Sequence, residues 1–165
     1  MNVRDVMTCS PLTVDLDTSL REAAGLMKQR GIRHLPVVDR AGRLMGILTD
    51  RDIRHAAFMP ALSEQLSRDP RRLKAPLVRD VMTWSVVTTD PEATLVQAGL
   101  TMFQRRIGSL PVVENGRLVG ILTERDMLTA LRKEDGIESD PDASVGPGDR
   151  GARSTDRASA ADPDV

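Results

Sequence analysis

The chain has 165 residues, a formal net charge of −1 and a single cysteine, Cys9. One cysteine excludes an intramolecular disulfide, and the N-terminus lacks a charged segment followed by an apolar signal core, so we expect a cytoplasmic protein. No apolar run approaches the roughly 18 residues that a membrane helix needs, so no membrane partner is expected. We do not expect a nucleic-acid partner. The chain has only two phenylalanines, one tryptophan and no tyrosine, so few side chains are available for bases to stack on. Residues 1–132 carry 19 basic and 15 acidic side chains, an excess compatible with a small phosphate-bearing ligand.

Five predicted elements fill residues 1–59. Apolar or small residues recur at three-to-four spacing before Gly31, which is typical of a helix that ends at a glycine. Two short apolar runs around a glycine-bearing turn then predict a hairpin, which leads into a second helix. The predicted order is strand, helix, strand, strand, helix, at residues 10–14, 18–30, 35–38, 43–48 and from 49 or 50 onward.

A polar linker follows at residues 60–76, where leucines at positions 62, 66 and 73 predict a helical extension on the surface. The same order of elements returns in residues 77–132, at residues 85–89, 93–105, 110–113, 117–122 and 124–131. Residues 133–165 are acidic and rich in Asp, Ser, Gly, Pro and Ala. Such a segment buries too little apolar surface to offset its ordering entropy, so we expect a disordered acidic tail.

The second set of elements is a duplicate of the first. Residues 46–52, Gly-Ile-Leu-Thr-Asp-Arg-Asp, return at residues 120–126 with one change, and 28 of 50 aligned positions in the two copies are identical. The offset of 74 or 75 residues exceeds the roughly 20 to 50 residues of solenoid repeats. A unit of about sixty residues is marginally stable alone. We therefore expect the two copies to pack together, about a pseudo-two-fold axis, in one α/β fold.

Three motifs, in their order and duplication, resemble a tandem pair of CBS domains, which is called a Bateman module. In the first copy they are Asp5-Val6-Met7-Thr8, Arg33-His34-Leu35-Pro36-Val37-Val38-Asp39 and Gly46-Ile47-Leu48-Thr49-Asp50-Arg51-Asp52. The resemblance covers roughly residues 1 to 131. It implies two β-α-β-β-α repeats whose clefts bind adenine nucleotides such as AMP, ADP or ATP, or in some relatives S-adenosylmethionine or NAD. It also implies a homodimer with the helices of two pairs face to face, and an effector protein that the sequence does not name.

Thr49 and Asp52 are the first candidate ligand contacts, with Thr123 and Asp126 as their counterparts. Each threonine stands where a strand gives way to a helix, so its hydroxyl and the free N–H groups of the first helical turn suit a phosphate. Each aspartate follows three residues later and can accept two hydrogen bonds from a ribose diol. The alternative is that these residues only cap their helices, where Thr and Asp are favoured in any case. Two neighbouring arginines are candidate phosphate contacts or solvated surface residues: Arg51 and Arg125.

The stretch before the Pro-Val-Val strand differs between the copies. Copy one has Arg33 and His34, where copy two has Gly108 and Ser109. By the resemblance, relatives that bind AMP often carry basic residues here. This implies that the site with Arg33 and His34 prefers more anionic ligands, and that the site with Gly108 and Ser109 is weaker or empty. The alternative for His34 is a partly buried strand residue whose ring is satisfied by a neighbouring carbonyl.

Apolar residues that should flank an adenine fall into two groups, one for each site. The first group is Leu12, Thr13, Ile32 and Ile47, and the second is Val87, Thr88, Ile107 and Ile121. The prolines of the two Pro-Val-Val strands complete the candidate set: Pro36 and Pro111. All of these residues would look the same as ordinary core positions, and the sequence does not separate the two interpretations.

Neither a metal site nor a catalytic site is predicted. Cys9, His34 and His55 lack the spacing of metal ligands, and Cys9 is expected to be a small, semi-buried residue. The chain has no nucleophile elbow, Walker lysine loop or Rossmann glycine fingerprint. We therefore expect a regulatory module that needs no cofactor and takes an adenine nucleotide as its ligand. The alternatives are a structural or protein-interaction module with vestigial clefts, and a nucleotide hydrolase, for which we find no acid-base constellation.

Overall fold

The computed structural model describes residues 1–58 and 76–134 of the chain. Its elements are η1 (Val3–Asp5), β1 (Thr8–Cys9), α1 (Leu20–Arg30), β2 (His34–Val38), β3 (Leu44–Thr49), α2 (Asp50–Phe58), η2 (Val78–Asp80), β4 (Thr83–Trp84), α4 (Leu95–Arg105), β5 (Ser109–Glu114), β6 (Arg117–Thr123) and α5 (Glu124–Glu134). The α/β class and the duplicated order of elements are confirmed. The expected linker helix and the tail beyond residue 134 lie outside the described residues. Residues 133 and 134, which we assigned to the tail, belong to α5.

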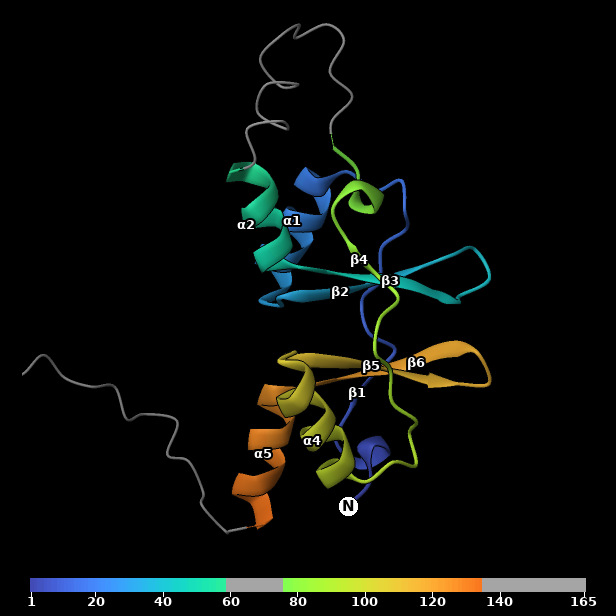
Figure 1. Cartoon of the computed structure of the whole chain (residues 1–165), viewed down its shortest axis with the longest axis vertical. Helices are drawn as coiled ribbons and strands as arrows, with labels where there is room; N and C mark the ends of the chain where they lie inside the picture. The colour runs from blue at the N-terminus through green and yellow to red at the C-terminus, as the bar shows by residue number, and fades with distance from the viewer. Residues whose placement is uncertain (59–75, 135–165) are drawn as a thin grey trace, which may run out of the picture.

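The two repeats form two stacked halves (Figure 1). The hairpins β2–β3 and β5–β6 lie next to each other in the middle of the molecule, and the helix pairs α1–α2 and α4–α5 lie toward its two ends. Each half holds a three-stranded sheet, with strand orders β2-β3-β4 and β1-β6-β5. The boundary between the repeats is therefore formed largely by the two hairpins.

The repeats exchange their leading strands. β1, from the first repeat, pairs antiparallel with β6 of the second, and β4, from the second repeat, pairs antiparallel with β3 of the first. The short segments before these strands cross as well: Val3 N–H donates to Ala93 O at 2.8 Å, and Val78 N–H donates to Thr18 O at 2.8 Å. From the sequence we grouped each leading strand with the other strands of its own repeat, whereas in the structure it joins the sheet of the other repeat.

The position of the leading strands is also corrected. The sequence predicted them at residues 10–14 and 85–89, but they lie two residues earlier, at β1 and β4. Ser10 and Ser85 have positive φ angles of 47° and 54°, so the extended backbone ends there. Further along, Val14 and Thr89 each form only an isolated parallel bridge, to Val37 and Val112.

Each hydrophobic core contains side chains of both repeats. The core under α1 and α2 includes Val78 and Met82 from the second repeat, and the core under α4 includes Val3 from the first. Val3 and Val78 are both fully buried. Neither repeat fills its own core, which agrees with the expectation that a unit of this size is not stable alone.

Glycine is required where the exchanged strands cross. A Cβ atom on Gly46 would lie 2.7 Å from the carbonyl oxygen of Thr83 and 2.8 Å from Sδ of Met82. On the other side, a Cβ atom on Gly120 would lie 3.2 Å from the carbonyl oxygen of Thr8 and closer still to Sδ of Met7. The glycine of each repeated Gly-Ile-Leu-Thr motif therefore lets a strand of the other repeat approach.

Local capping explains where the first helix of each repeat begins and ends. Ser19 caps α1 by accepting a hydrogen bond from Glu22 N–H at 3.2 Å, and Thr94 caps α4 by accepting one from Gln97 N–H at 3.2 Å. α1 ends at Gly31 in the left-handed conformation, with φ of 63°, as the sequence predicted. α4 ends in the same conformation at Arg106, with φ of 54°, although the residue there is not a glycine.

Candidate functional site

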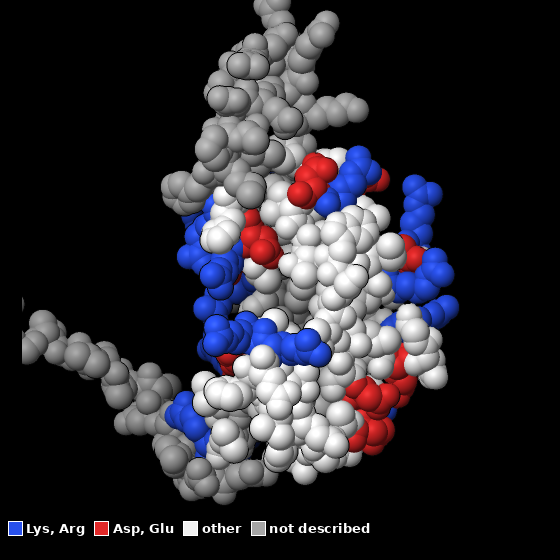
Figure 2. Space-filling view, viewed as in Figure 1, with Lys and Arg blue, Asp and Glu red and all other residues white. Residues whose placement is uncertain are grey.

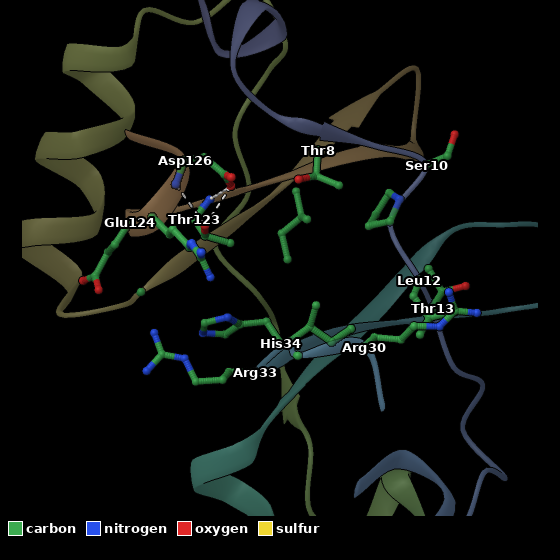
Figure 3. Close-up of a pocket in the computed structure, with 16 residues that line it drawn as sticks. Thr8, Ser10, Leu12, Thr13, Arg30, Arg33, His34, Thr123, Glu124 and Asp126 are labelled. Atoms are coloured by element: carbon green, nitrogen blue, oxygen red, sulfur yellow. Dashed lines mark hydrogen bonds between the residues drawn. The ribbon is translucent and has the colours of Figure 1, made fainter. Parts of the chain in front are cut away.

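A cavity of about 760 Å³ lies between the two repeats. Four segments line it: β1 with the loop after it, the turn from α1 into β2, the turn from α4 into β5, and the junction of β6 with α5 (Figure 3). The lining residues are Thr8, Ser10, Pro11, Leu12, Thr13, Arg30, Gly31, Ile32, Arg33, His34, Gly108, Ile121, Thr123, Glu124, Arg125 and Asp126. Because β1 pairs with β6, the loop after β1 is held against the second repeat, and both repeats contribute to one site.

Thr123 and Asp126 form a reciprocal pair at the start of α5. Asp126 Oδ2 accepts hydrogen bonds from Thr123 N–H at 2.8 Å and from Thr123 Oγ1 at 2.7 Å, and Asp126 N–H donates to Thr123 Oγ1 at 3.3 Å. The pair therefore caps the helix, as the alternative interpretation expected. Both hydrogen bonds that the Asp126 carboxylate accepts from Thr123 end on Oδ2. Oδ1 is therefore the carboxylate oxygen that a ligand hydroxyl could approach. Capping and ligand contact are compatible at this position.

Thr49 and Asp52 repeat this arrangement at the start of α2. Asp52 Oδ2 accepts from Thr49 N–H at 2.9 Å and from Thr49 Oγ1 at 2.7 Å, and Asp52 N–H donates to Thr49 Oγ1 at 3.2 Å. Neither residue lines the cavity of about 760 Å³. The chain thus contains two equivalent caps, of which one borders this cavity.

Basic side chains from both repeats border the cavity. Arg30, Arg33 and His34 come from the first repeat and Arg125 from the second, whereas the acidic residues of the lining come only from α5. In Figure 3, His34 and Arg33 lie across the cavity from Thr123 and Asp126, and Arg30 lies toward its other end. Figure 2 shows Lys and Arg side chains along the helical edge of the molecule where the repeats meet. The site can therefore accommodate an anionic group.

His34 is a titratable group whose environment in this cavity alters its proton affinity. Burial lowers the pKa of His34 below 6.5, and the nearby Arg33 guanidinium lowers the pKa further. Asp50, Glu124 and Asp52 act in the opposite direction but more weakly. The imidazole is therefore neutral at pH 7 and can gain a charge when an anion or a lower pH favours it.

Gly108 leaves room for the groups on either side of it. A Cβ atom there would lie 3.5 Å from Glu124 Oε2 and 3.7 Å from His34 Nε2. We expected Gly108 in a second site that is weaker or empty, but it borders the same cavity as His34. The difference between the copies at this position therefore shapes one site.

The grouping of the predicted site residues is corrected. We assigned Leu12, Thr13 and Ile32 to a site with Ile47, but they share the cavity with Ile121. For Leu12 and Thr13 the physical reason is the exchange of β1, which brings the loop after β1 onto β6 of the second repeat. Ile32 lies in the turn before β2, and the hairpin β2–β3 lies next to β5–β6 (Figure 1). Ten predicted residues come together in the cavity: Leu12, Thr13, Ile32, Arg33, His34, Gly108, Ile121, Thr123, Arg125 and Asp126.

The other predicted residues do not line this cavity. Pro36 and Pro111 are fully buried, so we withdraw them as ligand contacts. Ile47 and Ser109 are buried as well. A smaller cavity of about 280 Å³ is lined by Ser85, Val86 and Thr88 together with Leu44, Met45, Val113 and Gly116. Val87 and Ile107 pack against the core of the second repeat, and Arg51 is an exposed residue of α2.

Six lining residues were missed by the sequence analysis: Thr8, Ser10, Pro11, Arg30, Gly31 and Glu124. All of them lie within four residues of a predicted contact along the chain. Arg30 and Gly31 were interpreted only as the end of a helix, and Glu124 only as part of the repeated motif. Cys9 is exposed, which corrects the expectation of a semi-buried residue.

Among residues 1–58 and 76–134, no three His, Cys, Asp or Glu side chains gather in a way that could hold a metal ion. In the same part of the chain, no helix is both long and apolar enough to cross a membrane.

Comparison with known proteins identifies the family. The profile of the CBS domain matches residues 3–58 and residues 78–133, the two repeats described above. The chain belongs to the CBS-domain family. Its repeats are therefore two CBS domains, and the exchanged strands join them into one CBS-domain pair.

Relatives of similar length are themselves CBS-domain proteins. A CBS domain-containing protein of Dictyostelium discoideum is 37% identical over 132 residues, which cover 79% of this chain and 91% of that protein. The CBS domain-containing protein YhcV of Bacillus subtilis is 36% identical over 126 residues, which cover 76% of this chain and 82% of the relative. The match to an enzyme, inosine-5'-monophosphate dehydrogenase of Methanocaldococcus jannaschii, covers only 22% of that enzyme.

Solved CBS-domain pairs share the fold. CBSX2, solved in complex with AMP, superposes with a TM-score of 0.70 at 28% identity and covers 81% of this chain and 98% of CBSX2. The CBS domain pair of protein MJ0100, solved with 5'-methylthioadenosine and S-adenosyl-L-methionine, superposes with a TM-score of 0.69 at 28% identity, and the alignment covers 81% and 98% of the two chains. CBS-domain pairs of this fold thus bind adenosine derivatives.

Proposed function

We propose that this CBS-domain pair is a regulatory module that binds an adenine nucleotide in the cavity between its repeats. The observation that carries the proposal is the position of the Thr123 and Asp126 pair opposite Arg33 and His34 in one cavity (Figure 3). A nucleotide has a diol, an anionic end and a flat apolar base, and the cavity offers a partner for each.

The carboxylate of Asp126 is the proposed partner of the ribose diol, through Oδ1, since Oδ2 is engaged by Thr123. Arg33, Arg125 and His34 are the proposed partners of the phosphates. The adenine ring would lie against apolar side chains from both repeats: Leu12, Ile32 and Ile121. The excess of cationic side chains favours AMP, ADP or ATP over S-adenosylmethionine, whose sulfonium group carries a positive charge.

Binding at this place would regulate by population shift. The cavity has walls from both repeats, so a ligand that prefers one arrangement of the repeats stabilises that arrangement. The proposed partners are a second copy of the chain and an effector protein. A cytoplasmic location stays a prediction.

The test measures binding to two matched variants. Asp126→Ala removes the proposed ribose contact, and Asp52→Ala removes the equivalent cap at α2, outside this cavity. Both variants lose the same capping hydrogen bonds, so they should lose similar stability, about 0.5–2 kcal/mol each. The difference between them in nucleotide affinity isolates the ligand contact from the cap.

The ligands to compare are AMP, ADP, ATP, NAD and S-adenosylmethionine. For the one that binds best, we expect Asp126→Ala to lower the affinity by roughly 10- to 100-fold. This range corresponds to about 1.5–3 kcal/mol for a hydrogen bond to a charged group. Asp52→Ala should bind as the wild type. Calorimetry gives the affinities, and thermal unfolding screens the ligands, since a ligand at 100 times its Kd adds about 2.7 kcal/mol. Equal affinity of Asp126→Ala and wild type would refute the site, and no response to any nucleotide would favour a structural or protein-interaction module.

A further inference from the structure

The helix after each hairpin begins with an acidic residue, and this residue occupies the same place in both repeats. Asp50 N–H donates a hydrogen bond to Arg33 O at 3.0 Å. Glu124 N–H donates in the same way to Gly108 O at 3.1 Å. Each acidic residue directly follows the threonine that caps its helix. The backbone therefore places the two carboxylates equivalently, and any difference between them comes from the side chains around them.

The two carboxylates differ in whether a cation pairs with them. Asp50 Oδ2 forms an ion pair with Nη2 of Arg54, one helical turn later, at 3.1 Å. The residue equivalent to Arg54 in the second repeat is Leu128, which carries no charge. Among residues 1–58 and 76–134, no basic side chain forms an ion pair with the Glu124 carboxylate. In this part of the chain, the negative charge of Glu124 is therefore not neutralised by an ion pair.

Glu124 lies at the end of the cavity where Arg33 and His34 lie. All three residues border the cavity, whereas Asp50 does not. A Cβ atom on Gly108 would lie 3.5 Å from Glu124 Oε2 and 3.7 Å from His34 Nε2, so both groups come close to one point beside this glycine. Figure 3 shows Glu124, Arg33 and His34 on the side of the cavity away from Leu12. The cavity therefore has an unneutralised carboxylate among the cations that could bind an anion.

A nucleotide with its ribose at Asp126 would direct its phosphates toward this end of the cavity. Asp126 and Glu124 belong to the same first turn of α5, so the phosphates would lie near both. Arg33 and His34 can contact one phosphate, but each further phosphate brings more negative charge close to the Glu124 carboxylate. Like charges repel, and the repulsion grows with the charge of the ligand. The carboxylate thus opposes the preference for more anionic ligands that the two basic residues favour.

We propose that Glu124 is a specificity-determining residue that makes the cavity select AMP over ADP and ATP. This inference rests on the proposed function, a nucleotide in the cavity, and names the form of the nucleotide. The carboxylate raises the free energy of a bound polyphosphate more than that of a bound monophosphate. Water and salt screen the repulsion, because Glu124 is exposed. Removal of the charge should therefore change the selectivity by roughly 3- to 10-fold, which corresponds to about 0.7–1.4 kcal/mol.

The test compares the affinities of the full-length chain for AMP and ATP by calorimetry, at low salt and with a chelator of divalent cations. The measurements are made at about pH 8, where His34 is neutral. Glu124→Gln keeps the size of the side chain and removes its charge, so it should improve the affinity for ATP relative to AMP by the factor above. Glu124→Asp keeps the charge and should keep the preference for AMP. The matched control, Asp50→Asn, removes the equivalent acid outside the cavity and should leave the ratio unchanged.

Three outcomes would overturn the inference. The first is a wild type that binds ATP as tightly as AMP, and the second is an unchanged ratio of the two affinities in Glu124→Gln. The third appears when the titrations are repeated with Mg²⁺: a loss of ATP affinity in Glu124→Gln would mean that the carboxylate holds a cation bound by the phosphates. Binding that depends on Asp126 but not on Glu124 would refute this inference alone, whereas no binding of any nucleotide would refute the proposed function with it.

Discussion

Gly46→Ala tests the exchange of strands between the repeats. The added methyl group would lie 2.7 Å from the backbone oxygen of Thr83 on β4 and 2.8 Å from Met82 Sδ. The backbone oxygen can move only if β4 moves, because the register of β3 with β4 places Gly46 opposite Trp84. The substitution should therefore loosen the pairing that holds the second repeat's strand on the first repeat.

Overpacking of this kind costs about 1–3 kcal/mol, and the loss of glycine freedom in the unfolded chain offsets about 0.4–1 kcal/mol of it. The net destabilisation should be about 1–2 kcal/mol, which lowers Tm by about 2–8 °C in a chain of this size. Gly120→Ala should cost less, because its nearest neighbour is the flexible thioether of Met7 and its nearest backbone oxygen lies at 3.2 Å. Gly25→Ala, on an exposed helix with free space around it, should instead stabilise by about 0.5–1 kcal/mol.

Denaturant unfolding at one fixed protein concentration measures all three variants, because a change in dimerisation would otherwise alter the apparent stability. The free energy of unfolding should be highest for Gly25→Ala, followed in descending order by the wild type, Gly120→Ala and Gly46→Ala. The reasoning is refuted if Gly46→Ala is as stable as the wild type, since β4 would then not lie against Gly46.

Two further predictions concern His34 and Arg106. The pKa of His34 is lower in the folded chain than its usual 6.5, so the unfolded chain takes up this proton first as the pH falls. Stability should therefore fall as the pH drops through 6.5 toward the lowered pKa, and unfolding curves of His34→Gln should lack this part of the loss. Arg106 ends α4 with φ of 54°, where a left-handed conformation costs a non-glycine residue about 1–2 kcal/mol. Arg106→Gly should gain a net 0.5–1 kcal/mol, roughly, after the entropy of glycine is counted, and Gly31→Ala, at φ of 63°, should lose stability in the same assay.

Local patterns in the sequence predicted the local structure. The hairpins and helices follow from short-range signals such as Gly31 after α1 and the turn at Asn115 and Gly116, both of which have positive φ. The duplication also indicated that the repeats pack together. The duplicated motifs at Thr49 and Thr123 proved to be equivalent helix caps, with hydrogen bonds that agree within 0.1 Å.

The pairing between repeats could not be predicted in the same way. β1 and β4 belong to nearly identical motifs, so each could pair with β3 or with β6 without any change in local pattern. For this reason we grouped Leu12 and Ile32 with the helix cap of the first repeat, whereas they share the cavity with the helix cap of the second repeat. The same ambiguity also hid the role of Thr8, because a residue two positions before the expected strand gave no sign that it borders a cavity.

α5 connects the cavity to the outer side of the second repeat. Its first turn carries Asp126 at the cavity, and Leu128 and Leu131 follow as exposed residues of the same helix. A shift of α5 that accompanies binding in the cavity would therefore move exposed apolar side chains that a partner protein can contact. Thermodynamic linkage makes this coupling reciprocal, so a nucleotide that strengthens the dimer by some factor must bind the dimer more tightly by that same factor. The α1–α2 pair has no such connection, because its cap at Asp52 lies outside this cavity and the exposed side of α1 carries the cations Arg21 and Lys28.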